Sequence, residues 1–209
     1  MKSSSNSILG AISKSKMVLA IVLSISLLAT GCSAQWISIA LADLPVLTQM
    51  ALNIGTIVAT LQSGKQISST DATAIQNISE QASKDLNLLE TLYNEYKANP
   101  SASALQKIQS VIADINQNLP ALLQAAHVGD PVLSARIAAA VNLILTTVAS
   151  FATLIPQTST RSTAQTMAHP VVAIAIPKAS DLKKQWNQQV CGPTSNSTFD
   201  FSAAGCTVR

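Results

Sequence analysis

The chain has 209 residues, of which 48% are hydrophobic, 3% aromatic and 11% charged, and its formal net charge is +3. The three lysines that make up this excess, Lys2, Lys14 and Lys16, lie near the N-terminus, and from Ser33 onward ten basic side chains balance ten acidic ones. A balanced sequence without a basic stripe lacks the positive surface that binds nucleic acid, so we expect no nucleic-acid partner.

The N-terminal segment combines positive charge with a short apolar run. Its first 16 residues contain three lysines and no acidic residue, and residues 17–28 are uncharged. This run is shorter than the roughly 20 residues that a bilayer-spanning helix needs. A positive start followed by a short apolar run is typical of a secretory signal.

The residues that follow the apolar run end in a cysteine. The segment Leu28-Ala29-Thr30-Gly31-Cys32 resembles the bacterial lipobox, in which a small residue precedes an invariant cysteine. The resemblance implies that diacylglycerol is attached to the thiol of Cys32, that residues 1–31 are removed as a signal peptide, and that the new amine receives an acyl chain such as palmitate. Residues 32–35 would then form the lipid-anchored N-terminus.

We expect this anchor to place the protein in the cell envelope. Several acyl chains together hold a protein stably on a membrane, at about 0.8 kcal/mol per buried CH₂ group. In lipoproteins an Asp directly after the cysteine favours the inner membrane, whereas this chain has Ser33, which implies the outer membrane and its periplasmic face. An ordinary signal peptide or a plain membrane anchor is the alternative interpretation.

Residues 36–156 predict four helices. In the first, apolar residues recur at alternating spacings of three and four, which indicates one buried stripe. We expect Gly64 to end this helix and Pro45 to kink it or to start a new helix near Asp43. The stripe consists of Ala40, Leu44, Leu47, Ala51, Ile54, Val58 and Leu61.

The second and third helices have the same periodicity. The second is expected to begin at a Ser or Thr cap before Asp71 and to end before Pro100. The third is expected to be interrupted late by Pro120 and ended by Gly129. Their apolar stripes are Ile75, Ile78, Ala82, Leu86, Leu89, Tyr93 and Tyr96, and Leu105, Ile108, Ile112, Ile115, Leu119, Leu122 and Ala126.

The fourth helix has the strongest start signal, with Asp130 as N-cap and Pro131 at the first helical position. Residues 137–155 contain no charge and are long enough to span a membrane, but their Ala, Thr, Ser and Asn content favours burial in the protein core. Pro156 is expected to end this helix. Four such segments joined by short turns predict an all-α fold: an antiparallel four-helix bundle, up-down-up-down, with an irregular C-terminal tail.

The tail differs from the bundle in composition. Residues 157–177 are interpreted as a Ser/Thr-rich linker with a short extended segment, and residues 178–209 as a short helix followed by a loop. With Cys32 assigned to lipid, Cys191 and Cys206 are expected to form a disulfide that closes this loop in an exported protein. The alternative, a zinc site, is disfavoured because two cysteines without nearby histidines bind zinc poorly.

Few residues could carry chemistry. His127 is interpreted as a helix-ending residue, and His169 has no acidic neighbour in the sequence. The sequence contains no phosphate-binding loop, no catalytic serine motif and no cluster with metal-ligand spacing. We therefore expect no enzymatic activity, no cofactor and no metal.

Three functions remain open. The leading hypothesis is a non-catalytic interaction or envelope-structural module on the periplasmic side, with an unidentified envelope protein as partner. Trp186, Phe199 and Phe201 could contact that partner or could simply pack the tail on the bundle. The alternatives are a carrier that holds a lipid or other apolar ligand within the bundle, and a protein that inserts its first and fourth helices into a membrane.

Overall fold

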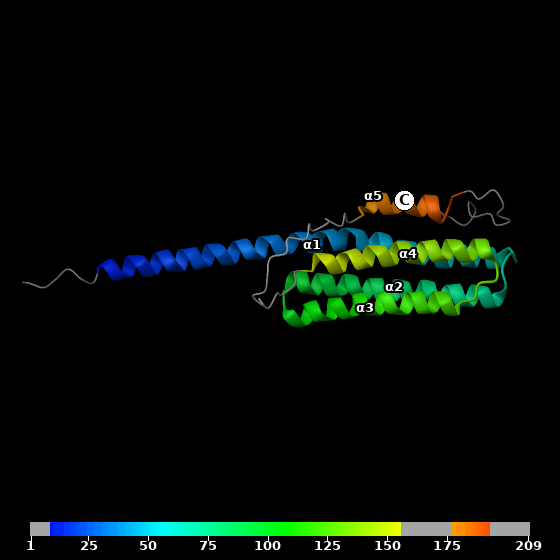
Figure 1. Ribbon diagram of the computed structural model, residues 1–209, viewed down its shortest axis with the longest axis horizontal. Coiled ribbons are helices and arrows are strands. Elements are labelled where there is room, and N and C mark those ends of the chain that lie inside the picture. Colours follow the sequence, from blue (N-terminus) through cyan, green and yellow to red (C-terminus); the bar gives the residue numbers. More distant parts are fainter. Residues whose placement is uncertain (1–8, 156–176, 193–209) are drawn as a thin grey trace, which may run out of the picture.

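The computed structural model describes residues 9–155 and 177–192, with side chains from residue 35 onward. The described residues form helices and no strand, so the predicted all-α class is confirmed (Figure 1). The helices are α1 (Leu9–Ser63), α2 (Ser69–Ala98), α3 (Ala102–Ala125), α4 (Pro131–Leu154) and α5 (Ala179–Gln189).

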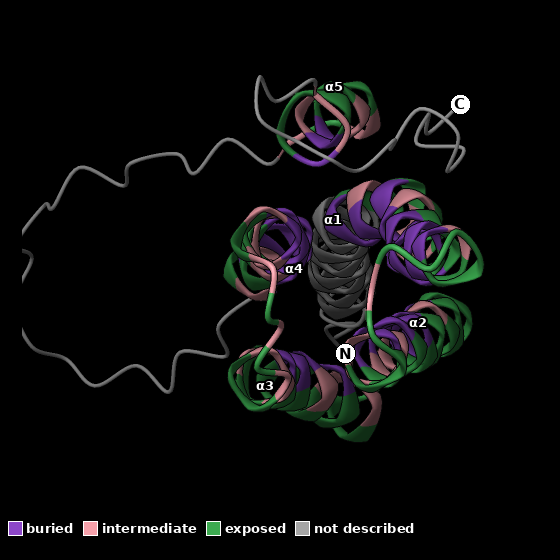
Figure 2. Cartoon of the chain, turned by 90° about the vertical axis from the view of Figure 1, so that its right-hand side faces the viewer, coloured by how far each residue is buried: buried purple, intermediate pink, exposed green. Residues whose placement is uncertain are grey.

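Helices α1 to α4 lie side by side with their long axes roughly parallel, and the N-terminal part of α1 extends beyond the other three (Figure 1). Viewed from one end, α1 to α4 turn their buried faces toward a shared interior (Figure 2). Helix α1 packs against α2 and α4, and α3 packs against the same two helices. Helix α5 lies on the outside, where it contacts α1 and α4.

Polar side chains cap the start of three helices, where the first backbone N–H groups lack helical partners. Ser68 Oγ accepts a hydrogen bond from the Asp71 amide at 3.0 Å. Ser101 Oγ caps α3 in the same way. The predicted cap of α4 is confirmed, because Asp130 Oδ1 accepts from the Leu133 amide at 2.8 Å and Pro131 is the first helical residue.

Helix α1 ends at Ser63, directly before Gly64 as predicted, in a Schellman-type turn. The Gln66 amide donates to the Leu61 carbonyl, and the Lys65 amide donates to the Gln62 carbonyl, both at 2.9 Å. In this turn the left-handed position, which glycine adopts most easily, is occupied by Lys65 with φ of 55°. Gly64 therefore lies one position before the residue that requires a positive φ.

No new helix starts near Asp43 and Pro120 does not interrupt α3, so these two predictions were wrong, while the kink expected as the other outcome at Pro45 stays a prediction. Pro45 lies inside α1 and Pro120 inside α3, and both helices are continuous through them. Proline removes one backbone hydrogen bond from a helix interior, at a cost of about 3 kcal/mol. At Pro45 the lost bond is on the exposed side of α1, where water can satisfy the free carbonyl, while the apolar stripe on either side keeps both halves buried.

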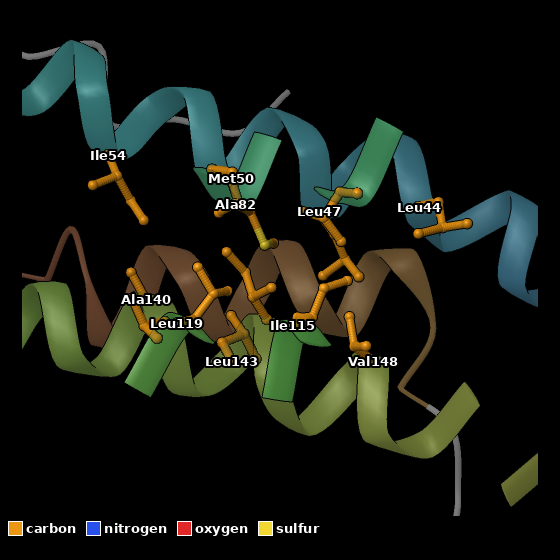
Figure 3. Packing of buried hydrophobic residues seen from close by; sticks show 14 of the residues in the cluster. Leu44, Leu47, Met50, Ile54, Ala82, Ile115, Leu119, Ala140, Leu143 and Val148 are labelled. Atoms are coloured by element: carbon orange, nitrogen blue, oxygen red, sulfur yellow. The ribbon is translucent and has the colours of Figure 1, made fainter. Parts of the chain in front are cut away.

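The predicted apolar stripes form the core. All seven stripe residues of α1 are at most 1% exposed, and those of α2 are fully buried up to Tyr93. In α3 the middle of the stripe is buried, whereas its ends at Leu105 and Leu122 are half-buried. Figure 3 shows core side chains of the four helices pointing toward one another. The buried stripe of α4 consists of Ile137, Val141, Ile144, Val148, Phe151 and Ile155.

Helix α4 is only half-buried, although Arg136 is its one charged residue. Its exposed side carries Asn142, Thr146, Ala149 and Thr153, which recur at helical spacing opposite the apolar stripe. By length and composition alone, Gln35–Ser63 and Pro131–Leu154 could each cross a membrane, and about half of each hydrophobic window is buried inside the protein. The core helix of a helical bundle has the same length and composition.

Helices α1 and α2 approach closely at Gly55. A Cβ atom at this position would lie 2.8 Å from Ser79 Oγ, closer than real contacts allow. That hydroxyl is buried and donates to the Ala51 carbonyl at 2.7 Å, which links the two helices. A glycine is therefore required at position 55 because a serine hydroxyl fills the space beside it.

We predict that Gly55→Ala and Ser79→Ala are energetically coupled. Alanine has a better helix propensity than glycine by about 1 kcal/mol, but in the native background its Cβ forces the Ser79 hydroxyl away from Ala51. In the Ser79→Ala background the space is free, so Gly55→Ala should stabilise by about 1 kcal/mol, measured by urea unfolding. Ser83→Ala is the matched control, with no coupling expected. Equal effects of Gly55→Ala in all three backgrounds would contradict the packing described.

Candidate functional site

The residues singled out in the sequence lie in different parts of the molecule. Cys32 is within α1, in the part whose side chains are not described. Cys191 follows α5, is half-buried and is disulfide-bonded. Its predicted partner Cys206 lies outside the described residues, as do Phe199 and Phe201, so this pairing stays a prediction.

The histidines are not brought together with other reactive groups. His127 is exposed in the turn after α3, with φ of 42°, and its Nδ1 lies 2.9 Å from the Ala125 carbonyl oxygen. This placement agrees with the helix-ending role predicted for it. His169 lies outside the described residues. Within the described part of the chain, no group of three or more His, Cys, Asp or Glu side chains could hold a metal ion.

Helix α5 is attached to α1 and α4 through one apolar face. Leu182, Trp186 and Val190 recur every four residues and are at most 1% exposed. Trp186 therefore packs the tail on the bundle, which is one of the two roles expected for it. Its indole Nε1 is buried and makes no hydrogen bond in the described structure.

A buried carboxylate lies at the N-terminal end of α5. The N-cap residue of this helix, Lys178, makes no side-chain capping bond. Instead, Asp43 of α1, which is 3% exposed, accepts a hydrogen bond from the Ala179 amide. Burial raises the pKa of Asp43 above its ordinary value of 3.8, and this hydrogen bond acts in the opposite direction. Asp43 thus supplies the cap that the sequence of α5 lacks.

A buried guanidinium lies at the opposite end of α5. Arg136 of α4 is 5% exposed, and its Nη1 and Nη2 donate to the carbonyl oxygens of Val190 and Gly192 at 2.5 and 2.6 Å. Burial lowers the pKa of Arg136, but an arginine stays charged at any pH at which proteins are folded. The last carbonyls of a helix have no helical donors, so Arg136 satisfies two acceptors that would otherwise need water.

The two charges match the helix dipole. A helix carries partial positive charge at its N-terminus and partial negative charge at its C-terminus. Asp43 lies at the first and Arg136 at the second. We refer to Asp43, Arg136 and the apolar face of α5 as the α5 clamp. It determines both the position and the direction of α5, because a reversed helix would place each charge beside a pole of its own sign.

An aromatic cluster lies at one end of the molecule. The ring centroids of Trp36 and Tyr93 are 5.5 Å apart in an edge-on arrangement, and Tyr96 lies 5.8 Å from Trp36. Phe151 extends the cluster at 6.3 Å from Tyr93. Burial strongly raises the pKa of Tyr93, so its phenol stays neutral. Trp36 Nε1 and the Tyr93 hydroxyl are buried and make no hydrogen bond in the described structure.

Hollows on the surface include some whose walls are formed by residues that the structure describes. One of 460 Å³ lies over the close contact of α1 and α2, beside the exposed Leu52. A second, of 390 Å³, lies between the start of α4 and the end of α5, where Arg136 forms part of the wall. The third, of 330 Å³, lies at the α2–α3 turn, between Tyr96, Pro100 and Leu105.

The α5 clamp was not identified from the sequence. Asp43 and Arg136 are isolated charges within apolar stretches, and each contacts residues far along the chain. Such an isolated charge inside a predicted buried segment is the one signal that could have identified them, because a buried charge needs a partner.

Comparison of the chain with protein-family models, with curated proteins and with solved structures finds no match.

We predict that Arg136→Met loosens α5. The variant keeps the apolar packing but leaves the Val190 and Gly192 carbonyls without their charged donor, which should cost about 3 kcal/mol. Trp186 emission should shift to longer wavelength, and α5 amides should exchange faster with solvent. Lys184→Met removes an exposed charge from α5 itself and should change neither. Identical exchange of α5 in the native protein and in Arg136→Met would contradict the clamp.

We predict a specific pH dependence for Asp43. Because the pKa of Asp43 is raised in the folded state, the folded protein binds this proton more tightly than the unfolded chain does. The resulting stabilisation is complete below pH 3.8 and is lost as pH rises through the folded-state pKa. Asp43→Asn keeps an acceptor for the Ala179 amide but cannot titrate. The unfolding free energy of the native protein minus that of Asp43→Asn, from urea unfolding at pH 3 to 7, should therefore fall with pH. A rising difference would contradict this.

Proposed function

We propose that this chain is a bacterial lipoprotein, tethered through Cys32 to the periplasmic face of the outer membrane. It acts there as a non-catalytic interaction or structural module of the cell envelope. The observation that carries the proposal is the order of features in the first 32 residues: lysines, a short uncharged run, and a cysteine that follows small residues. The disulfide at Cys191 supports an oxidising compartment such as the periplasm.

We infer that the four long helices form an antiparallel bundle, up-down-up-down. The short connections at residues 64–68, 99–101 and 126–130 support this order. The aromatic cluster supports it as well, since Trp36, near the start of the part of α1 whose side chains are described, meets Tyr93 late in α2, and Tyr93 meets Phe151 late in α4. Helices α1 and α2 meet start to end and so run in opposite directions, whereas α2 and α4 meet end to end and so run in the same direction.

The use of the buried charges favours a structural role over catalysis. Asp43 and Arg136 are the buried charged side chains of the described residues, and both bind main-chain groups of α5. A catalytic acid or base needs a proton acceptor or donor within reach of a substrate. The two charged side chains that are most buried, Asp43 and Arg136, instead bind main-chain groups at the two ends of α5.

The alternative functions receive less support. A lipid carrier needs an apolar interior space, whereas the core side chains of the four helices point into the same interior and toward one another (Figure 3). Membrane insertion of α4 would place the exposed Asn142 and Thr146 against hydrocarbon, where unpaired polar groups are costly. The polar exposed side of α4 is suited to water.

The proposal predicts that acylation depends on Cys32 alone. Cells that express the full chain would be fed an alkyne-tagged palmitate, and the protein would be isolated and tested for the tag. The native protein should carry the tag, and Cys32→Ser should lose it and keep residues 1–31. Cys206→Ser is the matched control and should be tagged and processed normally. A tag that survives in Cys32→Ser, or a native protein that never acquires one, would refute the anchor.

A further inference from the structure

We propose that the end of the bundle formed by the aromatic cluster and the α2–α3 turn lies directly on the phospholipid surface that holds the anchor. This inference rests on the proposed lipidation of Cys32. It adds the orientation of the molecule and the surface through which it contacts the membrane. We refer to Trp36, Tyr96, Pro100 and Leu105 as the membrane-facing end.

The tether is too short to hold the bundle away from the membrane. Only residues 33–35 separate Cys32 from Trp36, which is 6% exposed and belongs to the core. In the structure this segment is part of the continuous helix α1, so the Cα atoms of the two residues are about 6 Å apart along the axis. Even a fully extended segment would span only about 14 Å.

The other helices bring two further segments to the same end. Tyr96 contacts Trp36 at 5.8 Å, and the turn between α2 and α3 begins three residues later. The hollow of 330 Å³ connects Tyr96 with Pro100 of that turn and Leu105 of α3. Figure 1 shows the α2–α3 turn at the end from which the N-terminal part of α1 extends. A surface that meets Trp36 therefore meets this turn as well.

The composition of this end suits a lipid interface. Tryptophan and tyrosine favour the level of the lipid headgroups, where their rings are shielded and their polar atoms find partners. Side chains on a helix lean toward its N-terminus, so Trp36 leans toward the anchor. Its Nε1 is a buried donor that makes no hydrogen bond in the described structure, and lipid ester oxygens or interfacial water can accept from it at the membrane surface.

Charge contributes less than the tether to contact between the membrane-facing end and the lipid surface. Lys97 is exposed in the last turn of α2 and can approach lipid phosphate, but Glu95 is exposed beside it.

The α5 clamp determines which end of α5 lies far from the membrane. Arg136, early in α4, binds the end of α5, so α5 runs away from the membrane-facing end and Cys191 lies toward the distal end.

The test uses the two tryptophans of the acylated full chain. The protein is purified from membranes in detergent and reconstituted in phosphatidylcholine vesicles whose acyl chains carry bromine near the headgroups, a short-range quencher of tryptophan. Trp186 lies roughly 20 Å farther from the anchor, because Asp43 meets Ala179 about 10 Å along α1 and Trp186 is about 10 Å along α5. We expect bromine to quench Trp36 but not Trp186. The emission of Trp186→Phe, which retains only Trp36, should therefore be strongly quenched. The emission of Trp36→Phe, which retains only Trp186, should not change.

A spacer provides a second measurement in the unsubstituted protein. Fifteen Gly/Ser residues inserted between Ala34 and Gln35 would lift the bundle by roughly 20 Å, and quenching of the native emission should fall to the level of Trp36→Phe. The same spacer between Val128 and Gly129, at the distal end, should leave quenching unchanged. Undiminished quenching with the first spacer would contradict the tether as the cause of contact, whereas a protein without a spacer in which Trp36 is not quenched would overturn the inference.

The two proposals fail in distinguishable ways. The mass of the N-terminal peptide is measured on each reconstituted sample. An acylated protein in which Trp36 is no more quenched than Trp186 would overturn the membrane-facing end and leave the anchor intact. A protein without acyl chains at Cys32 would overturn both.

Discussion

The apolar stripes of α1 to α4 can be removed from water only by packing against one another, and the remaining features of the structure depend on this constraint. Each stripe is narrow, because residues recur at spacings of three and four and few of them are aromatic. Narrow stripes of Ala, Val, Ile and Leu favour close helix contacts. At Gly55, helices α1 and α2 are so close that a Cβ atom there would lie only 2.8 Å from the Ser79 hydroxyl oxygen.

Helix α5 is too short to be stable alone, since isolated helices of this length are marginal in water. Its three apolar residues bury a single face, and its two ends are held by Asp43 and Arg136. Desolvating these charges is costly unless each finds a partner, and the unsatisfied ends of a helix are suitable partners. Asp43 and Arg136 are therefore each paired with one end of α5, and together they determine where the C-terminal segment begins.

The parts of the four long helices from residue 36 onward could be predicted because the signals for them are local, whereas the continuation of α1 back to Leu9 was not expected from the sequence. The stripe of α1, the cap at Asp130 and the end of α2 before Pro100 are each determined by residues within a few positions. Pro45 was misjudged because its effect depends on whether the lost hydrogen bond faces water, which only the fold decides. Lys65 was missed because the neighbouring Gly64 is the expected residue for a left-handed position.

The α5 clamp could not be predicted, for a different reason. Asp43 and Ala179 are 136 positions apart, and Arg136 reaches 54 positions along the chain to Val190. No periodicity links such pairs. The orientation toward the membrane likewise required both kinds of information: the sequence supplied the distance from Cys32 to Trp36, and the fold brought Tyr96 and the α2–α3 turn beside Trp36.

The central proposal, a helical bundle tethered outside the cytoplasm by acyl chains on Cys32, is tested most directly by the intact mass of the protein extracted from its host. We predict the mass of residues 32–209 with a diacylglyceryl group and a further acyl chain, less two hydrogen atoms for one disulfide. The mass of the complete 209-residue chain with free thiols would contradict the anchor, the compartment and the cystine together.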